Sequence, residues 1–431
     1  MKIRPIGIDL FAGVGGLSLA FEQAGFDVAA AVEIDPIHAA AHEYNFPRCK
    51  VLAQSVEHLS GDAIRKAAGI GAADVTVVFG GAPCQGFSLI GQRALDDPRN
   101  KLVRDFVRLV AELQADYFVF ENVKGITVGK HAQFLKELIE AFQDKGYDVV
   151  LPWKVLNAAN YGVPQNRERL ILMGCKKGLT LPKYPAAICQ AAGQDKEAGL
   201  PMGPSCKDAL GDLPDAEKYR TLLYSDAVKA KLGQPSPYAA ILRGDVTSTN
   251  DFSYPRKWNA AMLTSSMRSE HTSISRGRFR NTKGGDVEPV SRFFRLPEDG
   301  VSNTLRAGTD SARGAFTSPR PIHYRFDRCV TVREMARLHG FPDWFRFHQT
   351  KWHGARQIGN AVPPPLGKAV AGQIILAAGF KPARPGVHLE LGDESLLKME
   401  MKNAAAYFEV ASPIATRDRK GISRPRQVQA S

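Results

Sequence analysis

The first third of the chain alternates short apolar runs with amphipathic stretches. Runs rich in Val, Ile, Leu and Phe predict buried strands, and apolar residues that recur every three to four positions predict helices. This alternation is typical of a mostly parallel sheet with helices on both faces. The expected strands are residues 6–11, 28–34, 74–79, 117–121 and 170–175, and the expected helices are residues 17–24, 36–44, 102–113 and 134–145.

The pattern changes in the rest of the chain. Pro, Gly and Ser become frequent and periodicity fades, which predicts a smaller, irregular domain. Helical patterns then return at residues 332–339 and 364–378, and the final stretch is basic and poorly periodic. The expected parts are an α/β domain at residues 1–176, the irregular domain at 177–325, a return segment at 326–380 and a poorly structured tail at 381–431.

Charge and cysteine usage narrow the choice of partners. The 431 residues carry a formal net charge of +13 and a pI near 9.4, which favours a polyanionic partner; solubility alone is the plainer alternative. The six cysteines form no C-x-x-C pair, so neither a zinc site nor a disulfide framework is expected. No apolar run approaches the length of a membrane span. We expect a cytoplasmic protein with no metal and no membrane partner.

A glycine-rich turn follows the first expected strand. Gly13, Gly15 and Gly16 let the backbone approach a ligand closely at the start of a helix. Glu33 ends the second strand, where a carboxylate can bind ribose hydroxyls. The turn alone fits a dinucleotide site, an S-adenosylmethionine site or a purely structural turn.

A cysteine and a carboxylate follow two later strands. Cys84 stands after Pro83 in a glycine-rich turn, and Glu121 ends the next strand. Most lone cysteines are buried packing residues, but ligands of open α/β sheets bind at the edge where the strands end. This location indicates a nucleophilic thiolate at Cys84 and acid/base chemistry at Glu121.

Two sets of arginines are candidates for contacts with a nucleic acid. Arg167 and Arg169 precede the last strand and share one face if the segment is extended. They could hold a phosphate or a base edge, or form structural ion pairs. A second set lies in the basic stretch 267–283, which either contacts phosphates or is a solvated loop. Its arginines are Arg268, Arg276, Arg278 and Arg280.

These motifs, in this order, resemble the DNA (cytosine-5)-methyltransferase family. The resemblance covers most of residues 6–175 and 328–378, and its most specific signals are Pro83-Cys84-Gln85, Glu121-Asn122-Val123 and the Gln-x-Arg-x-Arg run that ends at Arg169. Residues 328–334 and 357–363 resemble the family's last two motifs. The resemblance implies an S-adenosylmethionine-dependent, Rossmann-like sheet in the first domain, with a target-recognition domain at 177–325 and a return segment that completes the catalytic domain.

The resemblance also implies roles for individual residues. Cys84 would attack C6 of a flipped cytosine, Glu121 would hold or donate a proton at N3, and Arg167, with Arg169, would act beside the base. The expected contacts with S-adenosylmethionine are Phe11, Gly13, Gly15, Gly16, Glu33, Ile34, Ser55, Val56, Pro83, Leu102, Asn360 and Ala361, and the expected contacts with DNA are Gln85, Ser88, Arg99, Arg268, Arg276, Arg278 and Arg280.

Two positions depart from the family pattern, and several alternatives remain. Ser55-Val56 stands where the family often has Asp-Ile, and Ile34 stands where a Trp is common. A related branch of the family that methylates tRNA would keep Cys84 and Glu121. A catalytically inactive DNA-binding relative would not need these residues. A nicotinamide oxidoreductase would leave Pro83-Cys84 unexplained. We expect a monomer on double-stranded DNA, associated with the nucleoid through it, either in a restriction-modification system or as an orphan methylase.

Overall fold

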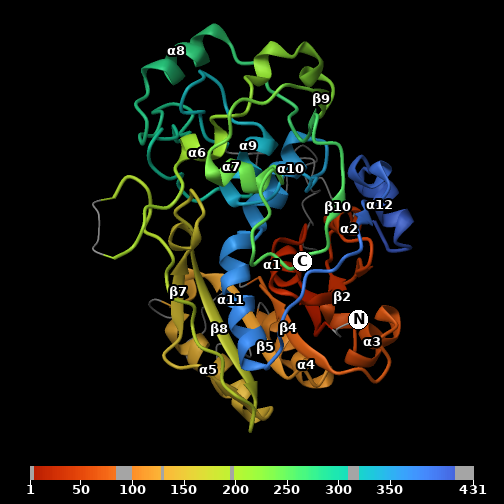
Figure 1. Ribbon diagram of the computed structural model, residues 1–431. Coiled ribbons are helices and arrows are strands. Elements are labelled where there is room, and N and C mark those ends of the chain that lie inside the picture. The colour runs from red at the N-terminus through yellow and green to blue at the C-terminus, as the bar shows by residue number, and fades with distance from the viewer. Residues whose placement is uncertain (1–3, 84–99, 128–130, 195–198, 309–319, 413–431) are drawn as a thin grey trace, which may run out of the picture.

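The protein is described from a computed structural model that covers residues 4–83, 100–127, 131–194, 199–308 and 320–412. Its centre is an eight-stranded sheet in the order β3-β2-β1-β4-β5-β8-β6, with β7 also paired to β8 (Figure 1). The sheet is mostly parallel and has helices on both faces, as predicted. The strands are β1 (Ile6–Leu10), β2 (Asp27–Val32), β3 (Lys50–Leu52), β4 (Val75–Gly80), β5 (Tyr117–Val123), β6 (Tyr147–Val149), β7 (Lys154–Asn157) and β8 (Glu168–Lys176).

The two faces of the sheet are covered by different helices because successive strand side chains point to opposite faces. In β5, Val119 belongs to one buried cluster and its neighbours Phe118 and Phe120 belong to the other. The Val119 side packs against α1 (Gly16–Ala24), α2 (Pro36–Asn45) and α11 (Pro364–Ala377), and the other side packs against α3 (Gly61–Ala68), α4 (Lys101–Glu112) and α5 (His131–Asp144).

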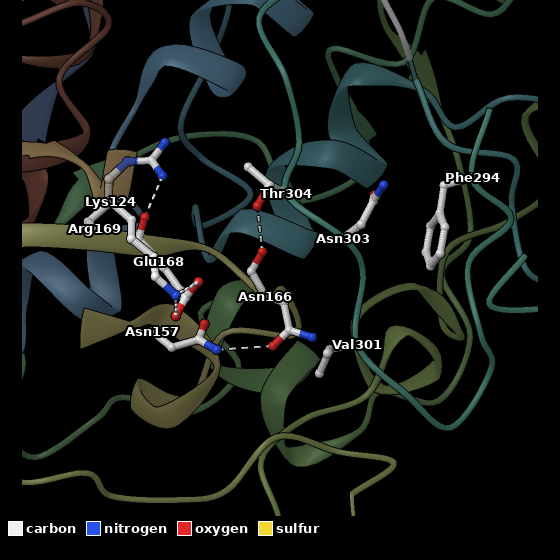
Figure 2. Close-up of a pocket in the computed structure, with 9 residues that line it drawn as sticks. All are labelled: Lys124, Asn157, Asn166, Glu168, Arg169, Phe294, Val301, Asn303 and Thr304. Carbon is white, nitrogen blue, oxygen red and sulfur yellow. Dashed lines mark hydrogen bonds and ion pairs between the residues drawn. The ribbon is translucent and has the colours of Figure 1, made fainter. Parts of the chain in front are cut away.

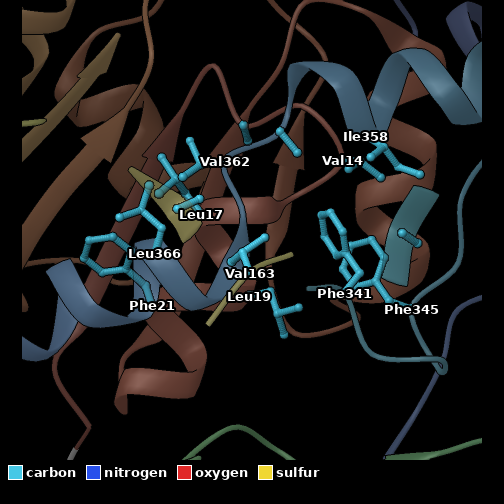
Figure 3. Close-up of a cluster of buried hydrophobic side chains, with 14 of the residues drawn as sticks. Val14, Leu17, Leu19, Phe21, Val163, Phe341, Phe345, Ile358, Val362 and Leu366 are labelled. Atoms are coloured by element: carbon cyan, nitrogen blue, oxygen red, sulfur yellow. The ribbon is translucent and has the colours of Figure 1, made fainter. Parts of the chain in front are cut away.

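Helix α11 brings the return segment onto the first domain. Figure 3 shows Leu366 of α11 and the preceding Val362 beside Leu17 and Phe21 of α1. The contact is close because α11 carries Gly367, where a Cβ would lie 2.6 Å from the Cβ of Ala20. Residues more than three hundred positions apart thus share one core.

The strand ends are level across the parallel part of the sheet. Leu10 of β1 pairs with Val32 of β2 and with Gly80 of β4, and Gly80 pairs with Phe120 of β5. The residue after each of these positions therefore lies at the same edge of the sheet. Those next residues are Phe11, Glu33, Gly81 and Glu121, so the register alone brings three of the predicted site residues to one edge.

The middle region forms a second lobe, drawn above the sheet in Figure 1. It is irregular, as predicted, with helices α6 (Cys206–Leu210), α7 (Pro237–Leu242) and α8 (Ser273–Asn281), short strands β9 (Val228–Lys229), β10 (Arg256–Lys257) and β11 (Met262–Leu263), and single turns of 3-10 helix between them. A solvated loop was one of the two alternatives for the basic stretch 267–283, and the structure excludes it for the second half, which is helical. Thr272 caps α8 by accepting a hydrogen bond from Ser275 N, and Gly277 lies inside the helix.

Helices α9 (Val332–His339) and α10 (Lys351–Asn360) of the return segment join this lobe to the sheet. Arg337 of α9 is fully buried between two carboxylates, with its Nε 2.6 Å from Asp343 and its Nη1 3.1 Å from Asp212. A buried guanidinium with two carboxylate partners fixes the orientation of its helix, because its donors reach both carboxylates in only one arrangement and would otherwise be left unpaired in the core.

The C-terminal segment corrects the expectation of an unstructured tail, at least for residues 381–412. It contains β12 (Leu389–Glu390), the 3-10 turn η9 (Glu394–Leu397) and α12 (Met401–Tyr407). Of these, η9 and α12 pack on α2. Leu397 is 1 % exposed, and β12 pairs with β10 of the second lobe. The local sequence is poorly periodic because its apolar residues serve contacts with distant elements.

Candidate functional site

The glycine-rich turn and Glu33 form one hydrogen-bonded unit after β1 and β2. Gly13 N donates to Glu33 Oε2 at 2.8 Å, and Asp35 N donates to Glu33 Oε1 at 2.9 Å. Burial raises the pKa of Glu33. Each carboxylate oxygen has a second lone pair, so Glu33 can still accept hydrogen bonds from ligand hydroxyls.

Glycine stands at the three predicted positions for different structural reasons. Gly13 has φ +55°, and an added Cβ would meet nothing within 4 Å, so this position faces open space. At Gly15 an added Cβ would lie 2.4 Å from the Phe46 ring, and at Gly16 it would lie 2.5 Å from the Val362 carbonyl oxygen. Gly15 and Gly16 are thus required by packing within the protein, and only Gly13 leaves room for a ligand.

The other positions predicted to bind the cofactor fall into two groups. Ile34 is 66 % exposed, Pro83 and Asn360 are also exposed, and Phe11 and Leu102 are half-buried beside the same core. The remaining three are used inside the protein. The hydroxyl of Ser55 caps the turn η1 (Val56–His58), the side chain of Val56 is buried, and the carbonyl of Ala361 accepts hydrogen bonds from two side chains.

Glu121 and Arg169 form an ion pair on neighbouring strands. Glu121 lies opposite Ile171 in the antiparallel β5–β8 ladder, so Arg169, two residues away, presents its side chain on the same face. Its Nε is 2.7 Å from Glu121 Oε1. Burial raises the pKa of Glu121 above its usual value, and the charges of Arg169 and Arg167 oppose that shift. The raised pKa is what proton transfer near neutral pH requires.

The chain that follows β4 runs close to the Glu121–Arg169 pair. At Gly81 an added Cβ would lie 2.4 Å from Glu121 Oε2, so a larger residue here would displace the carboxylate from its place beside Arg169. Asn122 Nδ2 donates to the Ala82 carbonyl at 2.9 Å and fixes the next residue. The predicted nucleophile Cys84 follows two residues later, and it lies outside the described residues, as do Gln85, Ser88 and Arg99.

Arg167 does not lie beside Glu121 as a second ion-pair partner. Its side chain is 1 % exposed, and its two terminal nitrogens donate to the carbonyls of Leu305, Gly359 and Ala361. The expected contact with a base or phosphate is therefore corrected, since these donors are occupied inside the protein. A structural role was the alternative that the sequence left open.

A pocket of about 610 Å³ opens beside the Glu121–Arg169 pair, between the sheet and the second lobe. Figure 2 shows Arg169, Lys124 and Glu168 on one side, and Asn303 and Thr304 of the second lobe on another. Sequence reasoning missed this pocket because Asn157 and Asn303 belong to no motif, Asn166 is an unspecified position of the Gln-x-Arg-x-Arg run, and the three amides meet only in the folded chain.

Three of the four arginines predicted to contact DNA from the stretch 267–283 lie beside acidic side chains. Arg276 forms a two-point ion pair with Glu217, and Arg278 lies 3.7 Å from Glu288. Arg268 is 9 % exposed. Arg280 pairs with Asp327 at 2.9 Å, yet its side chain is 71 % exposed, so it is the most accessible of the four to a phosphate.

Comparison with known proteins defines the class of this chain. A solved structure described as a DNA modification methyltransferase encoded within a prophage (E. coli) is 31 % identical, with a TM-score of 0.69, and covers 87 % of this chain and 100 % of its own. The fold is thus that of a DNA methyltransferase. The family model of C-5 cytosine-specific DNA methylases matches residues 6–376. The chain belongs to this family and is a DNA (cytosine-5)-methyltransferase, as the motifs indicated.

Curated relatives agree with this assignment. Type II methyltransferase M.XorII of Xanthomonas oryzae pv. oryzae is 59 % identical over 422 residues, which cover 98 % of this chain and 96 % of the relative. Type II methyltransferase M1.HphI of Haemophilus parahaemolyticus is 34 % identical and covers 85 % and 86 %. In the part of the chain that the structure describes, no helix is long and apolar enough to cross a membrane.

Proposed function

We propose that the enzyme transfers a methyl group from S-adenosylmethionine to C5 of a specific cytosine that is flipped out of double-stranded DNA, through a covalent adduct with Cys84. The observation that carries this proposal is the buried Glu121–Arg169 pair, 2.7 Å apart, at the sheet edge to which Gly81 leads the chain before Cys84. Flipping is required because C6 of a stacked cytosine is inaccessible to a side chain.

In this proposal the Cys84 thiolate and the Glu121 carboxyl carry out the chemistry together. The thiolate of Cys84 forms a bond to C6 while N3 of the ring takes a proton from Glu121, which leaves C5 electron-rich. Arg169 holds the Glu121 carboxyl and presents its remaining donors towards the bound base. C5 would then take the methyl group as the sulfonium–methyl bond breaks and S-adenosylhomocysteine leaves. Loss of the C5 proton to a base, expulsion of the thiolate and return of the N3 proton to Glu121 restore the aromatic ring. The raised pKa of Glu121 suits this role, because the group must carry a proton near neutral pH.

The residues after β1 and β2 fit S-adenosylmethionine. When bound, this donor supplies a methyl group on a sulfonium. Gly13 faces open space at a positive φ, Glu33 keeps free lone pairs for ribose hydroxyls, and the 66 % exposed Ile34 offers an apolar surface to the adenine. We include Phe11, Leu102, Pro83 and Asn360 in the same site. Ser55 and Val56 can take part in this site only through their backbone atoms or through adjacent residues. The Ser55 hydroxyl caps the turn η1, and the Val56 side chain is buried in the core.

Residues 177–325 form the target-recognition domain in this proposal. Sequence choice requires side chains in a groove of the DNA, and the pocket beside Arg169 has its far wall in this domain. The names of the curated relatives favour a role as the modification enzyme of a Type II restriction-modification system. We also propose that the enzyme acts as a monomer on DNA and associates with the nucleoid.

Bisulfite sequencing of DNA from cells that express the chain tests the proposal. The wild type should protect cytosines in one sequence context, and Cys84→Ser should abolish protection, because a hydroxyl is far less ionised than a thiol. Cys49→Ser is the matched control, since burial raises the pKa of the Cys49 thiol well above its usual value and keeps it unreactive. Methylation by Cys84→Ser at the wild-type level, or protection of RNA rather than DNA, would contradict the proposal.

A further inference from the structure

Arg167 is a fully buried cation with an unusual set of partners. Its Nη1 donates to the Leu305 carbonyl at 2.9 Å, and its Nη2 donates to the carbonyls of Gly359 at 2.8 Å and Ala361 at 2.9 Å. None of these partners is a carboxylate. A buried guanidinium is costly unless its donors are satisfied, and Arg167 Nε has no hydrogen-bond partner in the described part of the chain. The three carbonyls are therefore the only groups that offset the burial of Arg167 there, so they must be held in place, and Arg167 in turn holds them.

The three carbonyls come from two separate segments. Leu305 follows Asn303 and Thr304, which line the pocket beside Arg169 on the side of the second lobe. Gly359 and Ala361 flank Asn360, at the end of α10 and next to the glycine-rich turn. The segments also touch directly, since a Cβ added at Gly359 would lie 2.3 Å from Ala307 N. One side chain therefore fastens a DNA-side segment, residues 302–307, to a donor-side turn, residues 359–362.

Two neighbouring side chains strengthen the same junction. Gln165 Oε1 accepts from Leu305 N at 3.0 Å, and its amide nitrogen lies 2.9 Å from His339 Nδ1. Burial and the Arg167 charge lower the pKa of His339 well below its usual value, so this imidazole is neutral. Its Nδ1 accepts from Gln165, and its Nε2 donates to the Ala361 carbonyl at 3.0 Å. The donor-side turn continues to Val362, whose carbonyl packs against Gly16.

We propose that Arg167 is a positioning residue that couples the two substrate sites, so that DNA and the methyl donor each bind more tightly when the other is present. This inference rests on the proposed function of the two segments. When DNA orders residues 302–307, it fixes the position of the Leu305 carbonyl and so of the Arg167 guanidinium. The planar guanidinium then holds the carbonyls of Gly359 and Ala361, and with them the turn around Asn360. Lysine cannot replace it, because a single ammonium lacks the fork that reaches carbonyls of two segments.

The test measures the affinity for S-adenosylhomocysteine by calorimetry, with and without a saturating DNA duplex that carries the sequence found by bisulfite sequencing. The ratio of the two dissociation constants is the coupling factor, which typically lies at about 5–150 for coupled sites. We expect a factor in that range for the wild type and a factor close to one for Arg167→Lys. Gln165→Met, which leaves the guanidinium in place, should give an intermediate factor.

Arg333→Lys is the matched control for loss of a buried arginine. Arg333 is also 1 % exposed and donates to backbone carbonyls, those of Thr264, Pro342 and Phe345, and it lies in neither segment of the junction. Arg333→Lys should lower the melting temperature and keep the wild-type coupling factor. Unchanged coupling in both Arg167→Lys and Gln165→Met, an uncoupled wild type, or an equal loss in Arg333→Lys would overturn the proposal. A wild type that binds neither ligand would instead contradict the proposed function on which it rests.

Discussion

Arg169 Nε lies 2.7 Å from Glu121 Oε1, and this ion pair lies at the edge of the sheet where β4 and β5 end. The pairing follows from the antiparallel register, which sets Arg169 diagonally across from Glu121 on one face. The carboxyl is thus aimed by a guanidinium while burial keeps its pKa raised. This geometry leads to the first prediction.

Glu121→Gln should lower kcat by about 10²- to 10⁴-fold, the usual contribution of a positioned proton donor, and should leave DNA affinity close to that of the wild type. The matched control is Glu168→Gln, on the same strand as Arg169, whose exposed carboxylate pairs with Lys124. Single-turnover methylation of a tritium-labelled duplex would measure both variants. Equal losses in the two variants would mean that the charge at this edge, and not the proton on Glu121, matters.

Gly13→Ala should weaken the binding of S-adenosylhomocysteine because the new methyl group projects into the space assigned to the donor. Backbone strain is controlled by Gly69→Ala. Gly69 has φ +65°, close to the +55° of Gly13, and also has nothing within 4 Å of an added Cβ, but it ends α3 on the surface. Both variants should lose a similar amount of stability, about 1–2 kcal/mol, because an L-residue is strained in the left-handed region. Calorimetric affinities that fall equally in both would remove Gly13 from the donor site.

Asp9 should make stability depend on pH. Burial raises its pKa from 3.8 to about 8, although Ser18 Oγ donates a hydrogen bond to it at 2.7 Å. The raised value means that the folded state holds a proton that the unfolded state has lost. The stabilisation is complete below about pH 4 and declines as pH rises towards 8, by about 1.4 kcal/mol per pH unit.

Asp9→Asn replaces the carboxyl with a group that does not ionise, so the free energy of unfolding should depend less on pH in this variant. Urea unfolding of the two proteins between pH 5 and pH 8 gives the difference in free energy of unfolding at each pH. The difference should move steadily in favour of Asn as pH rises. A difference that stays constant with pH would show that Asp9 is ionised in the folded protein.

Arg280→Ala should lower DNA affinity and reduce the slope of log affinity against log salt by about one, as expected for one lost phosphate contact. Arg276→Ala should change the slope less, because Arg276 is held by Glu217 through two nitrogens and its side chain is less exposed than that of Arg280. Sequencing of methylated random-site libraries for Arg268, Arg276, Arg278 and Arg280 alanine variants shows which of them also relax the choice of sequence. An unchanged salt slope in Arg280→Ala together with unchanged site preference in all four would move recognition to other parts of the domain.

Local signals in the sequence were enough for α9 and for five of the eight strands of the sheet, but not for the short strands β3, β6 and β7. The helix α9 has the predicted bounds because Thr331 and Glu334 form a capping box at its start and Gly340 ends it in the left-handed conformation. The order of the motifs also brought Glu33 and Glu121 to one edge, since parallel strands end together.

Features that depend on distant partners could not be predicted in this way. Helix α8 buries only Phe279 and therefore lacks an apolar period, and Leu397 finds its core only after the chain returns to α2. Likewise, the sequence placed Arg167 and Arg169 on one face but could not show that one binds three carbonyls and the other a carboxylate. Those partners lie up to 194 positions away along the chain.

Covalent trapping tests the central claim most directly. A duplex with 5-fluorocytosine at the target position has fluorine where the C5 proton must leave, so an enzyme that attacks C6 and methylates C5 should stop at the adduct. Incubation with S-adenosylmethionine, followed by denaturing gel electrophoresis and peptide mass spectrometry, should reveal a DNA-linked peptide that contains Cys84, and Cys84→Ser should give none. Rapid methylation of ordinary duplex without any trapped complex, or a complex linked through another residue, would contradict the account.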